Sequence, residues 1–258
     1  MNFGEVTFLG ALQGITEFFP ISSSGHLLLA EHFFALDVEH LKAFDVVLHA
    51  GTLVALLALF WREWFSILKF EKSGRQLLVQ LIVATIPAAV IGVFFGDAMD
   101  ELTRGSKGTV VVAGFFVLVA VALFIAEKFG QQKIQKVGWK NVFWMSIFQA
   151  AALLPGISRS GSTIAAGMFS GLDRSAAAKF SFLMLAPATA GAVVLILKKV
   201  ADGEMTLPPT DLTLVGFVVS AIVSFACAAF LLRFVKKYSL KIFSLYLILA
   251  AVALFLIR

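Results

Sequence analysis

Charged residues are scarce in this chain of 258 residues. Asp, Glu, Lys and Arg together supply 14% of it, whereas a typical soluble domain carries about 25%. Hydrophobic residues supply 60%, and the mean hydropathy is +0.94. This composition excludes a soluble globular domain and a disordered chain. It predicts an all-α integral membrane protein whose solvent is the lipid bilayer.

Cysteine is nearly absent, and so is a basic leader. Cys227 is the single cysteine, which excludes an intrachain disulfide framework. The first residues, Met-Asn-Phe-Gly-Glu, lack the basic region of a secretory signal peptide. A net charge of +5 would point to nucleic acid in a soluble chain. Here we assign it to basic connectors at a membrane face and expect no nucleic-acid partner.

Apolar runs of two kinds alternate along the chain. Six approach or reach the roughly 18–20 residues that cross a bilayer, and we predict transmembrane helices at 46–61, 77–95, 110–126, 179–197, 212–232 and 242–257. Four are too short or too broken to cross: 3–19, 21–36, 142–154 and 160–172. Each consecutive short pair meets at a Pro/Ser/Gly junction, which favours a turn. We therefore predict two re-entrant helical hairpins. Their tips should line a wet cavity, because irregular backbone at membrane depth is tolerated only there or inside protein.

One polar segment occurs twice, 136 residues apart. Residues 13–26 read Gln-Gly-Ile-Thr-Glu-Phe-Phe-Pro-Ile-Ser-Ser-Ser-Gly-His, and residues 149–162 read Gln-Ala-Ala-Ala-Leu-Leu-Pro-Gly-Ile-Ser-Arg-Ser-Gly-Ser. We predict one membrane domain, 1–258, built from a repeat at about 1–127 and a second at about 138–258. Each repeat holds one hairpin and three crossings. An odd number of crossings inverts the second copy, which gives an inverted-topology repeat with six transmembrane helices.

The distribution of Lys and Arg predicts the orientation of this fold. The connectors 62–76, 128–140, 171–179 and 233–241 hold 14 basic residues. The face that carries both termini holds six: Lys42, Arg104, Lys107, Lys198, Lys199 and Arg258. The positive-inside rule then places both termini outside the cytoplasm. The two hairpins enter from opposite sides, and their tips meet within the membrane.

Ionisable side chains at the two tips predict the chemistry. Burying a charge at the centre of a membrane helix costs at least ~2.5–3.5 kcal/mol, yet the tips carry Glu17, His26 and Arg159. An arginine between Ser158 and Ser160 suits phosphate oxygens, and helices that begin at the tips add backbone amides. The candidate residues are Gln13, Glu17, Ser22, Ser23, Ser24, His26, Ser158, Arg159, Ser160 and Thr163. Phosphoryl transfer fits this set.

Simpler interpretations compete with that function. Glu17 and Arg159 could form a buried ion pair that locks the hairpins together, and any of the serines could be a helix cap. Gln13 and Gln149 could hold packed helices together. Histidines beyond the tip, His49 among them, are expected to be interfacial or structural.

Two stretches resemble the signatures of a known family. Gln13, Glu17 and the run Pro-Ile-Ser-Ser-Ser-Gly-His at 20–26 resemble its first motif, and Pro-Gly-Ile-Ser-Arg-Ser-Gly-Ser-Thr at 155–163 resembles its second. The family is the undecaprenyl-pyrophosphate phosphatase, or bacitracin-resistance, family of bacterial membranes. The resemblance covers almost the whole chain. It implies hydrolysis of undecaprenyl diphosphate to the monophosphate, which recycles the lipid carrier of cell-wall synthesis.

The resemblance also implies a site that opens to the outer face of the cytoplasmic membrane, and a divalent cation, Mg²⁺ or Ca²⁺. Ser23 is the preferred nucleophile, with His26 or Glu17 as its base; water activated by His26 is the alternative. Arg159 would stabilise the transferred phosphoryl group. Glu17 with Gln13 would hold the metal or orient the diphosphate. The hydroxyls of Ser22, Ser24, Ser158, Ser160 and Thr163 would complete the substrate cradle.

Two other functions remain open at this point. Inverted repeats with broken helices also build secondary transporters, so a lipid flippase or an ion-coupled carrier is the alternative. Acid-phosphatase-like lipid phosphatases need a second histidine soon after the arginine, and residues 160–178 contain none. The sequence leaves the oligomeric state open, a homodimer included.

Overall fold

Helices make up the regular structure of the described part of the chain. The computed structural model describes residues 1–36, 38–101, 108–130 and 133–256. The helices are α1 (Phe3–Phe18), α2 (Ser23–Phe33), α3 (Val38–Leu59), α4 (Trp61–Leu68), α5 (Lys72–Glu101), α6 (Gly108–Phe129), α7 (Trp139–Ala151), α8 (Arg159–Phe169), α9 (Arg174–Ala201), α10 (Thr210–Phe234) and α11 (Lys241–Leu256). Arg104, Lys107, Arg258 and the last residue of the predicted crossing 242–257 lie outside the described residues.

Within the described residues, five helices are long and apolar enough to cross a bilayer, which confirms a polytopic membrane protein. They contain the segments Leu41–Leu59, Lys72–Gly96, Gly108–Phe129, Arg174–Ala201 and Thr210–Phe234. The sixth predicted crossing is α11, which is apolar but has 16 residues. A helix of that length spans about 24 Å, somewhat less than the ~30 Å of a hydrocarbon core. The short helix α4 lies where the sequence predicted only a connector.

The four short apolar segments fold as two helical hairpins. In the first, α1 ends at Phe18 and α2 begins at Ser23, where the Gly25 amide donates to Ser22 Oγ at 3.3 Å. In the second, α8 begins at Arg159, and the Gly161 amide donates to Ser158 Oγ at 3.0 Å. Both helices have 11 residues and start 136 residues apart. Of the repeated serines, Ser22 and Ser158 are therefore helix caps, as one of the simpler interpretations proposed.

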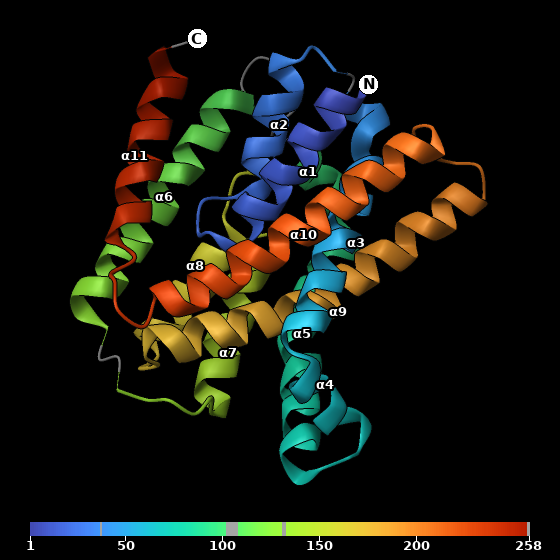
Figure 1. Ribbon diagram of the computed structural model, residues 1–258. Coiled ribbons are helices and arrows are strands. Elements are labelled where there is room, and N and C mark those ends of the chain that lie inside the picture. Colours follow the sequence, from blue (N-terminus) through green and yellow to red (C-terminus); the bar gives the residue numbers. More distant parts are fainter. Residues whose placement is uncertain (37, 102–107, 131–132, 257–258) are drawn as a thin grey trace.

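Each hairpin packs on a long helix from the other half of the chain. Helix α1 packs on α10, and α7 packs on α5 (Figure 1). Helices α3 and α9 contact each other, as do α6 and α11. On α1, a Cβ added to Gly10 or Gly14 would come 2.8 Å from the α10 backbone, so small residues allow this close approach. This exchange of partners is what a two-fold relation between the halves produces.

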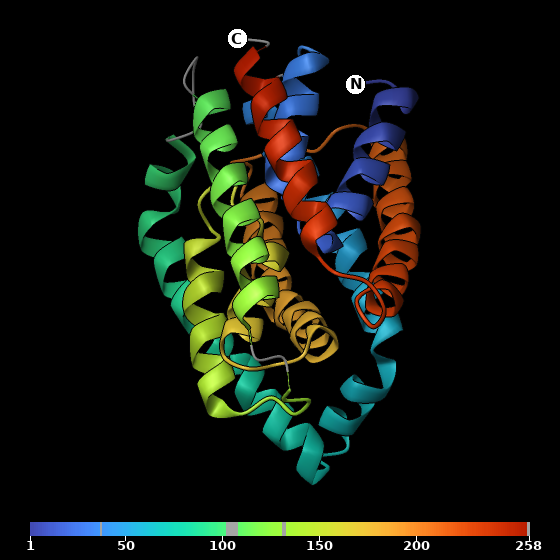
Figure 2. The same cartoon turned by 90° about the vertical axis from the view of Figure 1, so that its left-hand side faces the viewer.

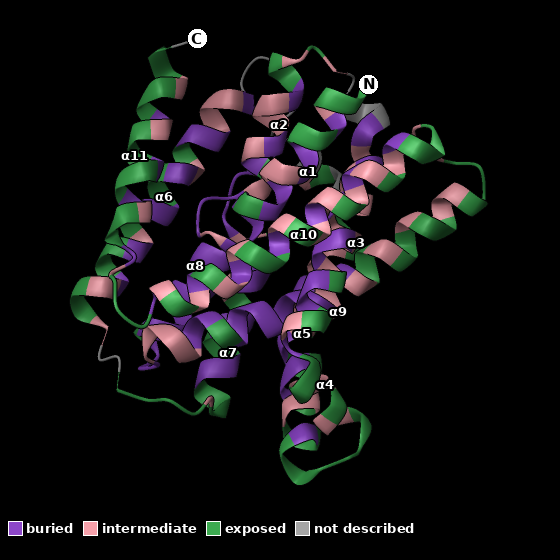
Figure 3. Ribbon diagram, viewed as in Figure 1, coloured by how far each residue is buried: buried purple, intermediate pink, exposed green. Residues whose placement is uncertain are grey.

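The start of α1 and the end of α11 lie at the opposite end of the molecule from the α4–α5 turn. In both views α1 begins and α11 ends at the top, whereas α4 and the start of α5 lie at the bottom (Figures 1 and 2). Lys179 on α9 contacts Glu63 on α4 at 2.5 Å. The outer faces of the long helices expose large apolar side chains, such as Val93 and Phe94 on α5. The buried residues concentrate where the hairpins meet the long helices (Figure 3).

Candidate active site

The tips of the two hairpins are in direct contact. Ser160 Oγ donates to the Phe19 carbonyl at 3.1 Å, and the Gly156 amide donates to Ser24 Oγ at 3.3 Å. Gly156 has φ +96°, and a Cβ there would lie 3.1 Å from Val112 Cα. Only glycine fits that backbone at low cost. The break in the second hairpin is thereby fixed against the first, and the predicted meeting of the tips is confirmed.

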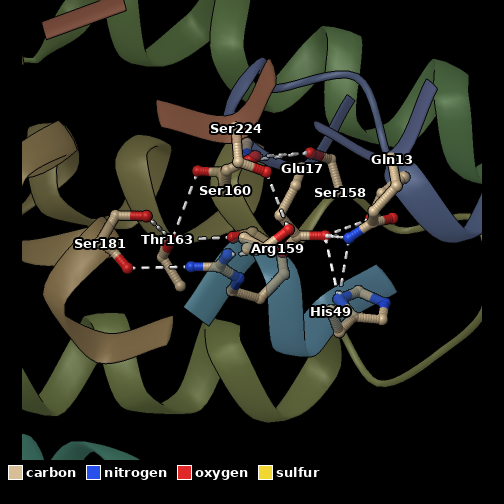
Figure 4. A network of polar contacts seen from close by, with 12 residues as sticks. Gln13, Glu17, His49, Ser158, Arg159, Ser160, Thr163, Ser181 and Ser224 are labelled. Carbon is tan, nitrogen blue, oxygen red and sulfur yellow. Dashed lines mark hydrogen bonds and ion pairs between the residues drawn. The ribbon is translucent and has the colours of Figure 1, made fainter. Parts of the chain in front are cut away.

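Glu17 is the centre of the site. Its side chain is buried, with 5% of the residue exposed. Arg159 Nη2 donates to Glu17 Oε1 at 2.8 Å, and Ser23 Oγ donates to Glu17 Oε2 at 2.6 Å. Gln13 Nε2 donates to the same Oε2 at 3.0 Å from one turn earlier on α1 (Figure 4). One buried carboxylate therefore joins the arginine of one tip to a serine of the other.

Arg159 is held from its other side by α9. Its Nη1 donates to the Ser181 carbonyl at 2.9 Å, and Ser181 Oγ lies 2.7 Å from Thr163 Oγ1. Thr163 Oγ1 also donates to the Arg159 carbonyl at 2.7 Å. Figure 4 shows the guanidinium between Ser181 and Glu17. Ser181 was not among the predicted residues, because nothing in the tip sequences points to α9.

His49 belongs to the site, although the sequence analysis expected it to be structural. Its Nδ1 lies 2.9 Å from Gln13 Nε2 and 3.5 Å from Glu17 Oε2. An amide NH₂ can only donate, so this Nδ1 accepts from Gln13 when the ring is neutral. A usable signal was present: His49 lies inside a predicted crossing, and an intramembrane ionisable residue indicates function by default.

His26 faces away from Ser23. Its Nδ1 lies 2.7 Å from the Ser22 carbonyl, and its Nε2 lies 2.7 Å from the Tyr246 hydroxyl on α11. The carbonyl can only accept, so Nδ1 carries the proton and Nε2 accepts from Tyr246. The ring stacks on Phe116 at 5.3 Å between centroids. Of the two bases predicted for Ser23, Glu17 contacts the hydroxyl and His26 does not.

A cavity of about 340 Å³ opens beside these groups. Its polar lining consists of Glu17, Ser23, Ser24, His49, Gln149, Ser158, Arg159, Ser160 and Thr189. Among the predicted site residues, Gln13, Ser22, His26 and Thr163 are not part of this lining. Its apolar wall includes Ala88, Leu185 and Ala192 from the long helices α5 and α9. One cavity is thus lined by polar residues of both tips and by apolar residues of the long helices.

Comparison with known proteins identifies the family of the chain. Residues 6–253 match the model of the family described as bacitracin resistance protein BacA. The chain belongs to the BacA family. A relative from Thermodesulfovibrio yellowstonii, named undecaprenyl-diphosphatase, is 39% identical over 98% of this chain and 96% of its own. One from Thermomicrobium roseum with the same name is 38% identical over 100% and 98%, and undecaprenyl-diphosphatase 4 of Bacillus thuringiensis subsp. konkukian is 38% identical over 95% and 93%.

The BacA resemblance implied a divalent cation, and the site offers few oxygen ligands for one. Across the described residues, no three His, Cys, Asp or Glu side chains cluster as a metal site. Both Glu17 oxygens already accept from donors. Gln13 Oε1 and Gln149 Oε1, however, are buried and have no hydrogen-bond partner among the residues that the structure describes. Amide and carboxylate oxygens are ligands for hard cations, so Gln13 and Glu17 fit a cation that takes its other ligands from substrate and water.

Gln149 fills the role that the sequence analysis gave it and adds another. Its Nε2 donates to the Ala84 carbonyl at 3.2 Å, which joins α7 to α5. The Gln149 side chain also lines the cavity, and its Oε1 has no hydrogen-bond partner among the described residues. The residue therefore both packs helices together and lines the same cavity as Arg159.

Proposed function

We propose that this chain hydrolyses undecaprenyl diphosphate to undecaprenyl phosphate and inorganic phosphate. The observation that carries the proposal is the Ser23 hydroxyl, 2.6 Å from the buried Glu17 carboxylate, with Arg159 2.8 Å from the other carboxylate oxygen. A nucleophile, a base and a phosphate-binding cation thus share one membrane cavity. The names of the BacA relatives supply the substrate. The product is the lipid carrier of peptidoglycan synthesis, and its recycling would confer bacitracin resistance.

The chemistry follows from the donors and acceptors in place. Ser23 Oγ attacks the terminal phosphorus while Glu17 takes its proton. The bond from that phosphorus to the bridging oxygen breaks, and undecaprenyl phosphate leaves with the proton that Glu17 took. Glu17 is then a carboxylate again and takes a proton from the water that attacks the phosphoserine. The bond from phosphorus to Ser23 Oγ breaks, inorganic phosphate leaves, and Glu17 returns the proton to the hydroxyl. Arg159 neutralises charge on the transferred group, as an arginine finger does.

Before substrate binds, Glu17 and Arg159 are paired with each other. A diphosphate would compete for the Arg159 guanidinium through bidentate hydrogen bonds. Glu17 is then free to act as base. We include in the proposal a divalent cation, Mg²⁺ or Ca²⁺, held by Glu17 and Gln13; when bound, it would neutralise the diphosphate oxygens. The serines at 22, 24, 158 and 160, with Thr163, shape the cradle.

The membrane arrangement is part of the proposal. Six crossings and two re-entrant hairpins form an inverted repeat, the membrane is the bacterial cytoplasmic membrane, both termini are extracytoplasmic, and the site opens outward. The positions of the start of α1, the end of α11 and the basic α4–α5 turn support it (Figure 2). We expect a periplasmic reporter fused after Arg258 to be active and one inserted in the 69–75 turn to be inactive. The reverse pattern contradicts this orientation.

A direct assay tests the function. Purified protein in nanodiscs should release phosphate from a polyprenyl diphosphate, and a chelator should reduce the release. Glu17→Gln, which keeps the size of the side chain but not its charge, is the matched control and should be inactive. Absence of phosphate release with any divalent cation contradicts the enzyme and leaves the lipid carrier function.

A further inference from the structure

The helical elbow between α4 and α5 exposes apolar and basic side chains together. Helix α4 ends at Leu68 and α5 begins at Lys72, and the two helices pack against each other. We call residues 61–75 the elbow. It lies at the lower end of the molecule in both views, away from the active site (Figures 1 and 2). No residue of α4 is buried, so this helix is a surface element whose outer face needs an explanation.

The elbow is tightly built, so its exposed side chains are held in place. The Glu71 amide donates to the Ser66 carbonyl at 3.2 Å, and Ser66 Oγ lies 3.2 Å from Ser73 Oγ. A Cβ added to Gly74 would come 2.1 Å from the Ser66 carbonyl oxygen, so only glycine fits this crossing of the two helices. Phe70, at the turn, has φ +53°. The backbone therefore fixes the direction of the side chains at the tip.

One face of α4 carries large apolar side chains that the protein leaves uncovered. Trp61, Phe65 and Leu68 recur with helical spacing and therefore share a face. They are 52–70% exposed, and Phe70 beyond them is 70% exposed. The packing of α4 on the core uses other residues, Trp64 and Ile67. An exposed apolar patch of this kind marks an interaction surface.

Basic side chains surround this apolar face. Lys69, Lys72 and Arg75 are exposed, and no ion pair joins them to any residue that the structure describes. Arg62 lies over the Trp61 ring, with Cζ 5.2 Å from the ring centroid. The elbow has two acidic residues, of which Glu63 is already paired with Lys179 at 2.5 Å. An excess of positive charge therefore accompanies the aromatic rings.

The start of α5 fixes the depth of the elbow in the membrane. The run 77–95 carries no charged residue and is about 28 Å long as a helix, close to the ~30 Å of a hydrocarbon core. Lys72 and Arg75 precede it by roughly 3–8 Å along the helix, and the headgroup layer is roughly 5–8 Å thick on each side. The outer face of α5 continues the patch with Val79 and Ile82, which are about half exposed.

We propose that the elbow binds the headgroup layer of anionic phospholipids. Trp61 and Phe65 lie at the level where aromatic side chains are enriched, between hydrocarbon and water. Lys69, Lys72 and Arg75 then contact the lipid phosphates, as clusters of basic residues next to a membrane helix do. An amphipathic helix with aromatic residues on one side and cations on the other is suited to such a boundary. With the proposed orientation of the chain, these lipids belong to the cytoplasmic leaflet.

Quenching of tryptophan fluorescence by brominated lipids tests the contact. The full chain is placed in nanodiscs that contain phosphatidylglycerol and phosphatidylcholine, with one or the other lipid brominated at the same mole fraction. The difference in quenching between wild type and Trp61→Phe reports on Trp61 and leaves Trp64 in its packed position. We expect brominated phosphatidylglycerol to quench Trp61 about twofold more than brominated phosphatidylcholine, and high salt to reduce that preference.

Two outcomes of that measurement overturn the proposal. Equal quenching by the two lipids removes the preference for anionic headgroups. Quenching by neither lipid places Trp61 away from the bilayer and leaves the apolar patch to a protein partner.

Substitution of the basic residues tests the source of the preference. The triple variant Lys69→Gln, Lys72→Gln and Arg75→Gln should lose the preference for phosphatidylglycerol and keep the quenching by brominated phosphatidylcholine. The matched control removes three exposed lysines of other connectors: Lys133→Gln, Lys136→Gln and Lys237→Gln. It should keep the preference. An elbow variant with an unchanged preference, or an equal loss in both variants, contradicts lipid binding by the elbow. None of these measurements uses phosphate release, so they decide the proposal whether or not the chain is a hydrolase.

Discussion

The two hairpin tips have the same backbone arrangement but carry different functional side chains. Both place a serine at the cap of an 11-residue helix, at Ser22 and Ser158. The next residue is Ser23 in the first tip and Arg159 in the second. The position of Glu17 is taken by Leu153 in the second copy. The cap geometry is thus common to both tips, while the proposed nucleophile and base lie on one tip and the arginine proposed to bind phosphate lies on the other.

The tips also differ in how firmly they are held. Every residue of α8 from Ser160 to Met168 is buried, whereas α2 buries three residues. Ser22 has φ +75°, a left-handed conformation that is strained for a residue with a side chain. Such strain concentrates at functional sites. Arg159 is therefore preorganised in the core, and Ser23 lies on a helix that is free to adjust.

Removal of the Ser23 hydroxyl should produce the largest change. Ser23→Ala should lower kcat by roughly 10⁴-fold or more, as loss of a nucleophile does, while affinity for the lipid diphosphate stays within about threefold. Binding survives because Arg159 and the second tip are untouched. The measurement is kcat and substrate affinity in nanodiscs.

The neighbouring serines are the controls for Ser23. Ser22→Ala and Ser24→Ala each remove one neutral hydrogen bond, a loss of ~0.5–1.5 kcal/mol. If Ser23→Ala keeps substantial kcat, the covalent step is wrong and an activated water is the nucleophile.

Arg159→Lys should be the next most damaging change. Lysine keeps the charge but cannot contact Glu17 and Ser181 together through one planar fork. We expect kcat/KM to fall by roughly 10²-fold or more, within the range lost with an arginine finger.

Arg174→Lys is the matched control for Arg159. Arg174 makes a two-pronged contact with Glu127 at 2.8 and 2.9 Å, away from the tips. Its replacement should leave kcat/KM within a few-fold of wild type. Equal, small effects of the two substitutions would reduce Arg159 to a structural ion pair.

The long helices repeat the contrast between the two halves. His49 on α3 corresponds, 136 residues later, to Leu185 on α9. His49→Leu therefore gives the first half the residue of the second. The substitution removes the hydrogen bond with Gln13 and the imidazole ring that lies near Glu17. We expect activity to fall roughly 10-fold, equivalent to ~1.4 kcal/mol. His49→Gln, which retains an acceptor for Gln13, should lose much less. Equal losses in both variants would show that the ring itself is needed.

The parts of the fold and site that depend on local sequence signals could be predicted, and the parts that depend on helix packing could not. The hairpins, their contact and the residues Glu17, Ser23 and Arg159 could be predicted, because short apolar runs, prolines and repeated caps are local signals. His49, Ser181 and Tyr246 could not be placed in the same way. They come from α3, α9 and α11, and only the packing of those helices brings them to the tips.

The ends of the helices could not be predicted from the local sequence either. Helix α5 runs to 30 residues and contains Pro87, whereas the sequence predicted a crossing at 77–95. A proline is tolerated inside a membrane helix when neighbours satisfy the freed backbone. The contacts of the His26 ring could not be predicted for a related reason. Its neighbours in the sequence are serines, but its ring contacts are Phe116 and Tyr246, which lie on distant helices.

The smallest expected effect concerns that histidine. Tyr246→Phe removes the hydroxyl that donates to His26 Nε2 and retains the aromatic ring. If the observed orientation is the working one, His26 positions Ser22 and the first tip through its Nδ1 proton. The loss should then be that of one neutral hydrogen bond, about fivefold in kcat or ~1 kcal/mol. Tyr238→Phe, at a residue that is 58% exposed, should change nothing. If His26 instead turns into the cavity to act as a base, Tyr246→Phe releases it, and kcat should rise. The sign of the change therefore decides whether the first tip holds one base, Glu17, or two.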